Sequence, residues 1–199
     1  MKKTGHFLSL LLAVLCLSAS AAWARPTVVI DAGHGGHDRG GVPGDRYAEK
    51  TYTLDVARRL EARLREAGYR TVMTRRGDYF VGLGQRCAVA NSQRNAIFVS
   101  IHFNSAPREG ANGIETYYYS RRSAGLAAAV HSRLVRATST EDRRLRVRGF
   151  YVIRNTRVPA VLAECGFLSN RSEGRLIAGS PAYRQRLADA LASAIRSRY

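Results

Sequence analysis

One stretch near the start of the chain, residues 27–36, limits its possible folds more than any other. It reads TVVIDAGHGG, so four β-favouring residues run into Asp31 and then into a glycine-flanked histidine, His34. An apolar β-branched run that stops at a glycine predicts a buried strand followed by a tight turn. In open α/β sheets, ligands bind beyond the carboxyl ends of the strands, which makes His34 a candidate for chemistry. A single loop histidine is, however, more often structural.

The first 24 residues have the pattern of a secretory signal peptide. Lys2 and Lys3 form a charged start, residues 7–17 are apolar, and residues 22–24 read AWA, a small-x-small cleavage site. The apolar segment is too short to span a bilayer, and no other segment is long and apolar enough. We therefore expect an exported protein without a membrane span.

Residues 25–199 are strongly basic. The whole sequence has a formal net charge of +17, and removal of Lys2 and Lys3 with the signal leaves +15, nearly all of it arginine. Such a charge predicts attraction to an anionic polymer or surface. Nucleic acid fits this charge, and so does a cell envelope rich in carboxylates and phosphates. Export favours the envelope. The tyrosines at 117–119 lie in GIETYYY, which alternates like a sheet strand, so they are expected to pack in the core rather than to stack on bases.

Alternating strand and helix patterns predict one α/β domain over residues 25–199, with a mostly parallel central sheet and helices on both faces. We expect strands at 27–31, 69–74, 96–103, 113–120 and 160–164, and helices at 49–67, 83–91, 123–137 and 181–198. The strand, helix and strand between residues 27 and 74 form a βαβ unit, which makes this part of the sheet parallel. Residues 143–148 are expected to form a basic loop.

Two cysteines remain beyond the signal segment, Cys87 and Cys165. Export exposes them to an oxidising compartment, where a disulfide is an option. Both lie among apolar residues, which slightly favours two buried and unpaired thiols.

Residues with metal-binding or acid–base potential fall at the ends of three expected strands. His34 follows the first strand, His102 ends the strand over 97–102, and Glu164 ends the strand over 160–164. If the strands are parallel, these side chains converge at one edge of the sheet, and Glu49 at the start of the first helix can reach the same edge. Two histidines and a carboxylate form a known ligand set for catalytic zinc, and a remaining carboxylate can act as general base.

Each of these residues also has a structural explanation, so spacing alone leaves a metal site and its absence equally open. His102 suits a hydrogen-bonded core position, and Glu49 favours the helix dipole. Glu164 is harder to explain, because a carboxylate directly after an apolar strand is costly to bury without a partner or a function. Other catalytic patterns are weaker: the chain has no phosphate-binding loop and no H-E-x-x-H, and Cys165 has no evident activator.

Six segments, taken in order, resemble the zinc-dependent N-acetylmuramoyl-L-alanine amidases. They read VVIDAGHGG, AEKTYTLD, FVSIHFNS, GIETYYY, FYVIRNT and PAVLAECGFLSN, and the match covers essentially all of residues 25–199. The resemblance implies that this region is a catalytic domain that hydrolyses the amide between N-acetylmuramic acid and L-alanine in peptidoglycan. It also implies one zinc ion held by His34, Glu49 and His102, with Glu164 as the catalytic glutamate.

Further expectations concern the surroundings of this site. Asn104, two residues beyond a ligand, is expected to hydrogen-bond substrate or product, and Asp31 to support the turn or a ligand. Phe103 and Cys165 depart from the residues usual in the family at these positions. Residues 120–124 are too short for the inserted helix that plugs the site in some relatives.

The expected binding partner is peptidoglycan, and anionic envelope polymers are a second option. We expect no nucleic-acid partner, and the sequence does not indicate a protein activator. The expected location is the periplasm or the exterior, in association with the cell wall. Two alternatives remain open: a catalytically inactive peptidoglycan-binding module and, less favoured, a basic nucleic-acid-binding protein.

Overall fold

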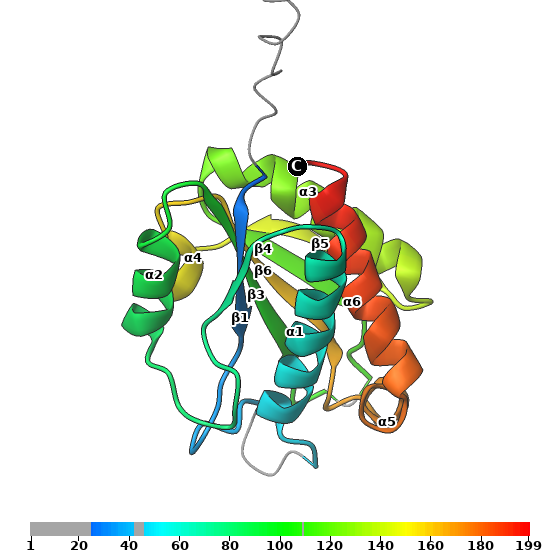
Figure 1. Cartoon of the computed structure of the whole chain (residues 1–199). Helices are drawn as coiled ribbons and strands as arrows, with labels where there is room; N and C mark the ends of the chain where they lie inside the picture. Colours follow the sequence, from blue (N-terminus) through cyan, green and yellow to red (C-terminus); the bar gives the residue numbers. More distant parts are fainter. Residues whose placement is uncertain (1–24, 42–45, 109) are drawn as a thin grey trace, which may run out of the picture.

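A six-stranded sheet forms the centre of the computed structural model, which describes residues 25–41, 46–108 and 110–199 (Figure 1). The strands are β1 (Thr27–Ala32), β2 (Thr71–Met73), β3 (Ala96–Asn104), β4 (Ile114–Tyr118), β5 (Asp142–Val147) and β6 (Ala160–Phe167), in the spatial order β2-β1-β3-β6-β4-β5. All neighbouring pairs are parallel except β4 and β6. The prediction of a mostly parallel α/β sheet is confirmed, and the signal segment predicted at 1–24 lies outside the described residues.

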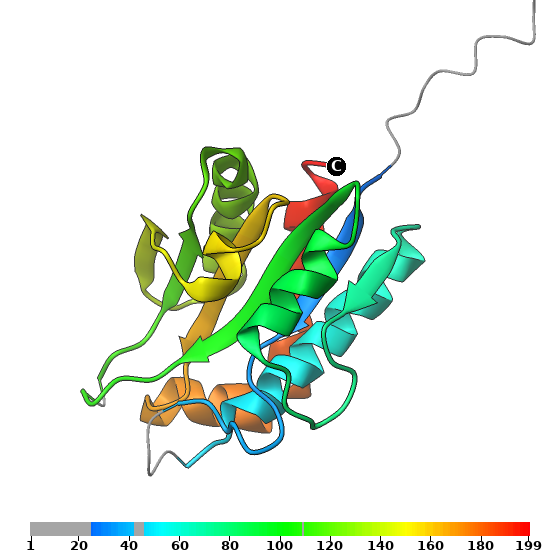
Figure 2. The same ribbon diagram turned by 90° about the vertical axis from the view of Figure 1, so that its left-hand side faces the viewer.

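Helices cover both faces of the sheet (Figures 1 and 2). One face is packed by α1 (Glu49–Glu66), α3 (Ala124–Ala137) and α6 (Pro181–Arg196), and the other by the shorter α2 (Leu83–Asn91) and α4 (Tyr151–Arg154). A 3-10 turn, η1 (Arg121–Ser123), precedes α3, and α5 (Arg171–Gly179) packs against β6 and α6. Within the described ranges, no helix has the length and apolar character needed to cross a membrane.

Strand alternation divides the core into two layers. On β3, Val99 and Ile101 belong to the large cluster under α1, α3 and α6, whereas Phe98 belongs to the smaller cluster under α2 and α4. Because side chains alternate along a strand, His102 shares the face of Phe98. On β6 the same alternation puts Glu164 on the face of Leu162, which packs with Phe98. The two site candidates on strands therefore share the face covered by the two short helices.

The cysteines lie in different layers of the core. Cys87 belongs to the cluster under α2 and α4, and Cys165 to the cluster on the opposite side of the sheet. Both thiols are free and buried, as the slightly favoured prediction stated.

Several boundaries differ from the sequence predictions. The expected basic loop at 143–148 is mostly the strand β5, which pairs in parallel with β4 along Thr116–Tyr118. Four of its six residues are exposed and three of the six are arginines, so it shows no apolar pattern. The strands β3 and β6 also continue past the predicted ends: Asn104 still pairs with Phe167, so His102 and Glu164 lie inside their strands. The helix α5 was not predicted.

Candidate active site and metal centre

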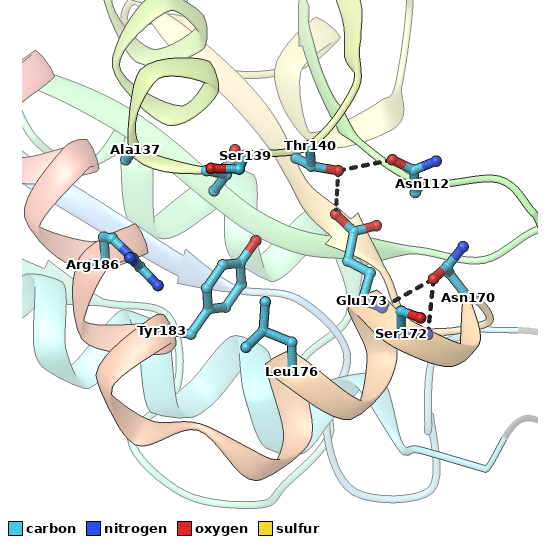
Figure 3. Close-up of a pocket in the computed structure, with 11 residues that line it drawn as sticks. Asn112, Ala137, Ser139, Thr140, Asn170, Ser172, Glu173, Leu176, Tyr183 and Arg186 are labelled. Atoms are coloured by element: carbon cyan, nitrogen blue, oxygen red, sulfur yellow. Dashed lines mark hydrogen bonds between the residues drawn. The ribbon is translucent and has the colours of Figure 1, made fainter.

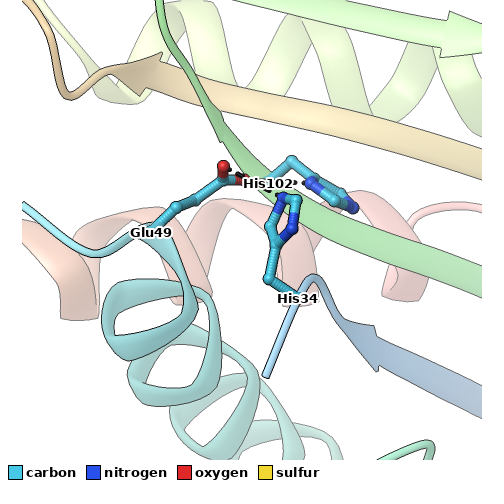
Figure 4. Close-up of side chains that lie close together, drawn as sticks. All are labelled: His34, Glu49 and His102. Carbon is cyan, nitrogen blue, oxygen red and sulfur yellow. Dashed lines mark hydrogen bonds and ion pairs between the residues drawn. The ribbon is translucent and has the colours of Figure 1, made fainter. Parts of the chain in front are cut away.

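The side chains of His34, Glu49 and His102 meet at the carboxyl ends of β1 and β3 (Figure 4). The Glu49 carboxylate lies between the two imidazoles: its Oε2 is 3.0 Å from His34 Nε2 and its Oε1 is 2.9 Å from His102 Nδ1. One ligand atom from each residue lies within 4.8 Å of the others. The structure thus brings together three residues that come from a turn, a helix start and a strand.

This donor set fits a divalent metal ion. Glu49 is only 3% exposed, and burial by itself raises the pKa of its carboxyl. Hydrogen bonds and charge from His102 and His34 outweigh that effect and hold the pKa at about 2, so Glu49 is anionic. Two imidazole nitrogens and one carboxylate oxygen, with room for water, are typical of catalytic zinc sites.

Both the pKa and the orientation of His34 are set by its neighbours. Burial lowers the pKa of its imidazole, but hydrogen bonds and charge from Glu49 and Asp38 raise it above 6.5 overall. Its Nδ1 is 2.8 Å from Asp38 Oδ2, while Nε2 faces Glu49. A carboxylate on the second ring nitrogen is the usual support of a metal-binding histidine, because it fixes the tautomer and the ring.

Two buried arginines hold the turn that carries His34. This residue has φ 60, in the left-handed region that is uncommon for residues other than glycine. Arg86 donates to the His34 carbonyl (2.8 Å) and to Asp31 Oδ1 (2.8 Å), and Arg75 donates to the carbonyls of residues 32 and 33. Asp31, expected to support the turn or a ligand, also accepts hydrogen bonds from Thr74 and Ser100.

Sequence analysis missed Arg75 and Arg86, because arginines in so basic a chain look like surface charges. A signal existed for Arg86 only: it lies on the helical stripe of Cys87 and Ala90, which are buried in α2.

Two glycines allow the ligand side chains to pack closely. A Cβ atom at Gly33 would overlap the His102 imidazole, and one at Gly40 would overlap the Glu49 carboxylate. Gly40 also has φ +69, a conformation that side chains rarely adopt. The glycine-rich loop therefore serves the geometry of the cluster as well as access to it.

Glu164 lies next to His102, its register partner on the neighbouring strand. Its Oε2 atom is buried and, within the described residues, has no hydrogen-bond partner. Burial, together with the charges of Glu49 and Glu115, raises the pKa of this carboxyl well above its ordinary value. An unpaired carboxyl with a raised pKa beside a candidate metal-binding cluster has the properties of a general acid–base.

Another carboxylate, the buried Glu115 of β4, is the register partner of Glu164 on the antiparallel neighbour β6. Its oxygens accept hydrogen bonds from Asn104 Nδ2 (2.9 Å), from the Tyr117 hydroxyl and from Arg143 Nε (3.0 Å). The predicted substrate contact Asn104 is thus oriented from within the chain, and its Oδ1 accepts from the backbone of residue 105. Glu115 was not among the sequence candidates.

An apolar cleft of about 430 Å³ opens beside the candidate metal-binding cluster, with His34 and His102 in its lining. Another cavity, of about 490 Å³, is lined by residues from α5, α6 and the segment after α3 (Figure 3). Its Glu173 accepts hydrogen bonds from Thr140 and from the backbone of Gly113 and Phe167, so it is a structural carboxylate. That second cavity shares no lining residue with the cluster.

Comparison with known proteins gives matches along the whole domain. The profile of a family described as N-acetylmuramoyl-L-alanine amidase matches residues 28–197. The uncharacterized protein YqiI of Bacillus subtilis is 40% identical over 188 residues, which covers 92% of this chain and 90% of that protein. The N-acetylmuramoyl-L-alanine amidase LytC of the same organism is 36% identical over 151 residues, covering 74% of this chain and 30% of LytC.

Solved structures show the same fold. The catalytic domain of the N-acetylmuramoyl-L-alanine amidase CwlV from Bacillus (Paenibacillus) polymyxa var. colistinus superposes with a TM-score of 0.83 and 39% identity. That match covers 87% of this chain and 97% of the CwlV domain.

Proposed function

The chain belongs to the N-acetylmuramoyl-L-alanine amidase family, and on that premise we propose that it cleaves the amide between N-acetylmuramic acid and L-alanine with one bound zinc ion. Hydrolysis of an amide in the cell wall is the activity that the family carries. The observation that most supports the finer proposal is the cluster of His34, Glu49 and His102 beside the unpaired carboxyl of Glu164.

His34, Glu49 and His102 would hold the ion through two nitrogens and one oxygen. Bound there, zinc supplies Lewis acidity that favours attack of water on an amide carbonyl. Asp38 keeps the His34 ring in place from its far nitrogen, and the backbone N–H of Phe103 donates to Glu49 Oε1 (2.9 Å). These contacts orient the ligand atoms before any ion arrives.

Glu164 would move the proton during hydrolysis. It takes a proton from the attacking water as the oxygen bonds to the amide carbon, and it gives that proton to the nitrogen as the C–N bond breaks. The products are a lactyl carboxylate on the sugar and a free L-alanine amine. The raised pKa supports the second half of this cycle, since a carboxyl that holds its proton tightly can deliver it to a departing amine. We keep Asn104 as a proposed substrate contact.

We further propose that residues 1–24 direct export and that the enzyme meets peptidoglycan in the cell wall. The net charge of +15 on residues 25–199 would also attract anionic envelope polymers. Such attraction between exposed charges weakens as salt screens it, so wall association should fall with ionic strength.

Digestion of purified peptidoglycan tests the reaction directly. The protein from residue 25 onward, supplied with zinc, should release stem peptides with a new L-alanine amine, and Glu164→Gln should release them far more slowly. If the wild-type protein binds peptidoglycan without releasing amines, it is a binding module. Retention of DNA or RNA at physiological salt would instead support the nucleic-acid alternative.

A further inference from the structure

We propose that the cleft beside the metal-binding cluster is the subsite for the glycan arm of the substrate, with a sugar ring lying against Phe80, Phe150 and Tyr151. The inference rests on the proposed function, because it assigns one of the two arms that meet at the scissile amide to this cleft. Nothing in the resemblance or in the ligand set makes that choice.

The cleft is continuous with the metal-binding cluster. One wall is formed by residues 80–83, which lead into α2, and the other by residues 150–152 at α4. Leu162 of β6 and the imidazoles of His34 and His102 complete the lining. Its volume of about 430 Å³ lies within the range of small-ligand sites. A part of the substrate that lies in the cleft is therefore next to the amide bond that would be cleaved at the cluster.

Large apolar side chains around this cleft are exposed. Phe80, Leu83, Phe150 and Tyr151 are 48%, 53%, 45% and 46% exposed. Apolar residues gathered in one place on a soluble domain usually mark a binding surface, whereas scattered ones need no explanation. All four line the same cleft.

Two of these rings are already held in position. Phe80 packs on His37, with ring centroids 4.3 Å apart, and Phe150 meets Tyr117 edge to face at 4.9 Å. Aromatic side chains present a large apolar area and have few rotatable bonds, so held rings lose little freedom when a ligand covers them. The flat C–H face of a pyranose ring is complementary to such a surface.

The charges of the cleft favour the sugar over the peptide. Of the described lining residues, Arg86 is buried and paired with Asp31, which leaves Asp38 as the charge at the rim. The Asp38 side chain is 39% exposed. The peptide arm carries free carboxylates, which Asp38 would repel, whereas sugar hydroxyls can donate to it.

The test compares two substrates that differ only in the sugar. One is an N-acetylmuramoyl peptide, and the other is the same peptide capped with D-lactate alone. We expect Leu83→Ala and Phe150→Ala to lower kcat/KM on the first substrate by about tenfold, mainly through KM. The rate on the D-lactyl peptide should stay close to that of the wild type. Leu176→Ala is the matched control, because this leucine is 43% exposed on α5 and lies outside the cleft.

Two outcomes would overturn the proposal. An equal loss on both substrates would mean that the cleft holds the peptide arm or shapes the cluster, and no loss on either would mean that the exposed side chains serve a protein partner. Zinc content and the urea midpoint of each variant show whether its fold is intact.

A binding measurement separates this proposal from the reaction itself. The peptide-free disaccharide of N-acetylglucosamine and N-acetylmuramic acid should shift the NMR signals of the wild-type cleft, and several-fold higher concentrations should be needed for Phe150→Ala. Failure of the wild type to cleave either substrate would reject the proposed function. Disaccharide binding would still show whether the cleft binds the glycan.

Discussion

His102 of β3 and Glu164 of β6 are register partners on neighbouring parallel strands, so the sheet itself fixes the distance between a candidate ligand and the candidate base. Adjacent strands lie about 4.8 Å apart, and sites built on strands hold their geometry better than sites built on loops. His34 and Glu49 come instead from a turn and a helix start. The placement of His34 depends on the hydrogen bonds of Arg75, Arg86 and Asp38, and Glu49 Oε1 accepts from the backbone N–H of Phe103.

Replacement of Glu164 by glutamine should separate catalysis from metal binding. The variant keeps the size of the side chain but cannot accept the proton, so we expect turnover to fall by about 10²- to 10⁴-fold. Its zinc content should equal that of the wild type, because Glu164 lies outside the cluster of possible ligands. Release of L-alanine amines measures turnover, and metal analysis of the same preparation measures zinc content. Loss of zinc from the variant would mean that Glu164 is a metal ligand rather than the general base.

Removal of the metal should abolish the activity reversibly. A chelator strips the ion from wild-type protein, and added zinc should restore amine release. His102→Ala should fail to recover, since it removes one of three ligand groups. The matched control is His131→Ala, whose imidazole bonds to Asp142 and Thr116 away from the cluster. Activity that survives exhaustive chelation in the wild type would exclude a metal mechanism.

The sequence was informative where a local pattern carries the structure. The run into His34 and the apolar strand before Glu164 predicted both strands, because buried parallel strands are continuous apolar segments. In a parallel sheet the carboxyl ends of the strands lie at one edge, so His34, His102 and Glu164 were expected to meet there. Glu49 was added because the start of its helix can reach the same edge.

Long-range contacts account for what was missed. Burial of Arg75 and Arg86 depends on carbonyl groups of a turn that is distant in the sequence, and nothing local distinguishes Arg75 from a surface arginine. The role of Glu115 depends on pairing between β4 and β6, which the chain order does not reveal. The edge strand β5 escaped notice because most of its residues are exposed and charged, and only Leu145 and Val147 are apolar.

Loss of the Arg86 charge should destabilise the protein strongly. Arg86→Met leaves the buried Asp31 carboxylate without its ion-pair partner, and breaking such a pair typically costs about 3–5 kcal/mol. Urea unfolding measures the change. Arg86→Met combined with Asp31→Asn should be less destabilised than the sum of the single variants, because the unpaired charge is gone. Arg63→Met, which removes an exposed ion pair with Asp189, should leave the midpoint near that of the wild type.

The two cysteines should not form a disulfide with each other under oxidising conditions. Cys87 and Cys165 lie in core clusters on opposite faces of the sheet, so no disulfide can join them within one molecule. Burial raises the pKa of both thiols, which slows their reactions further. A reducing agent should therefore leave the thermal midpoint unchanged, and a thiol reagent should react only after unfolding. A fall in the midpoint on reduction would show that this arrangement is wrong.

The stability of the metal-free protein should pass through a maximum between about pH 4.5 and pH 6.5. Glu49 has its pKa lowered from 4.5 to about 2, so its contribution is complete above 4.5 and is lost as the pH falls toward 2. His34 has its pKa raised above 6.5, so its contribution is complete below 6.5 and is lost as the pH rises through the folded value. Glu164 has its pKa raised from 4.5, so its contribution is complete below pH 4.5 and is lost as the pH rises above that value, which places the maximum near the lower end of this range.

Urea midpoints measured from about pH 4 to about pH 9 in the presence of a chelator test this dependence. Glu49→Gln should flatten the acid side, since the neutral amide has no proton to gain. Zinc should reverse the decline above pH 6.5, because a metal ion competes with protons for His34 and stabilises only the folded state. The reversal links the two roles of the cluster: the Glu49 carboxylate that pairs with protonated His34 in the metal-free protein is the same group that would face the ion. A chelated protein whose midpoint stays constant from pH 6.5 to pH 9 would contradict the raised pKa of His34.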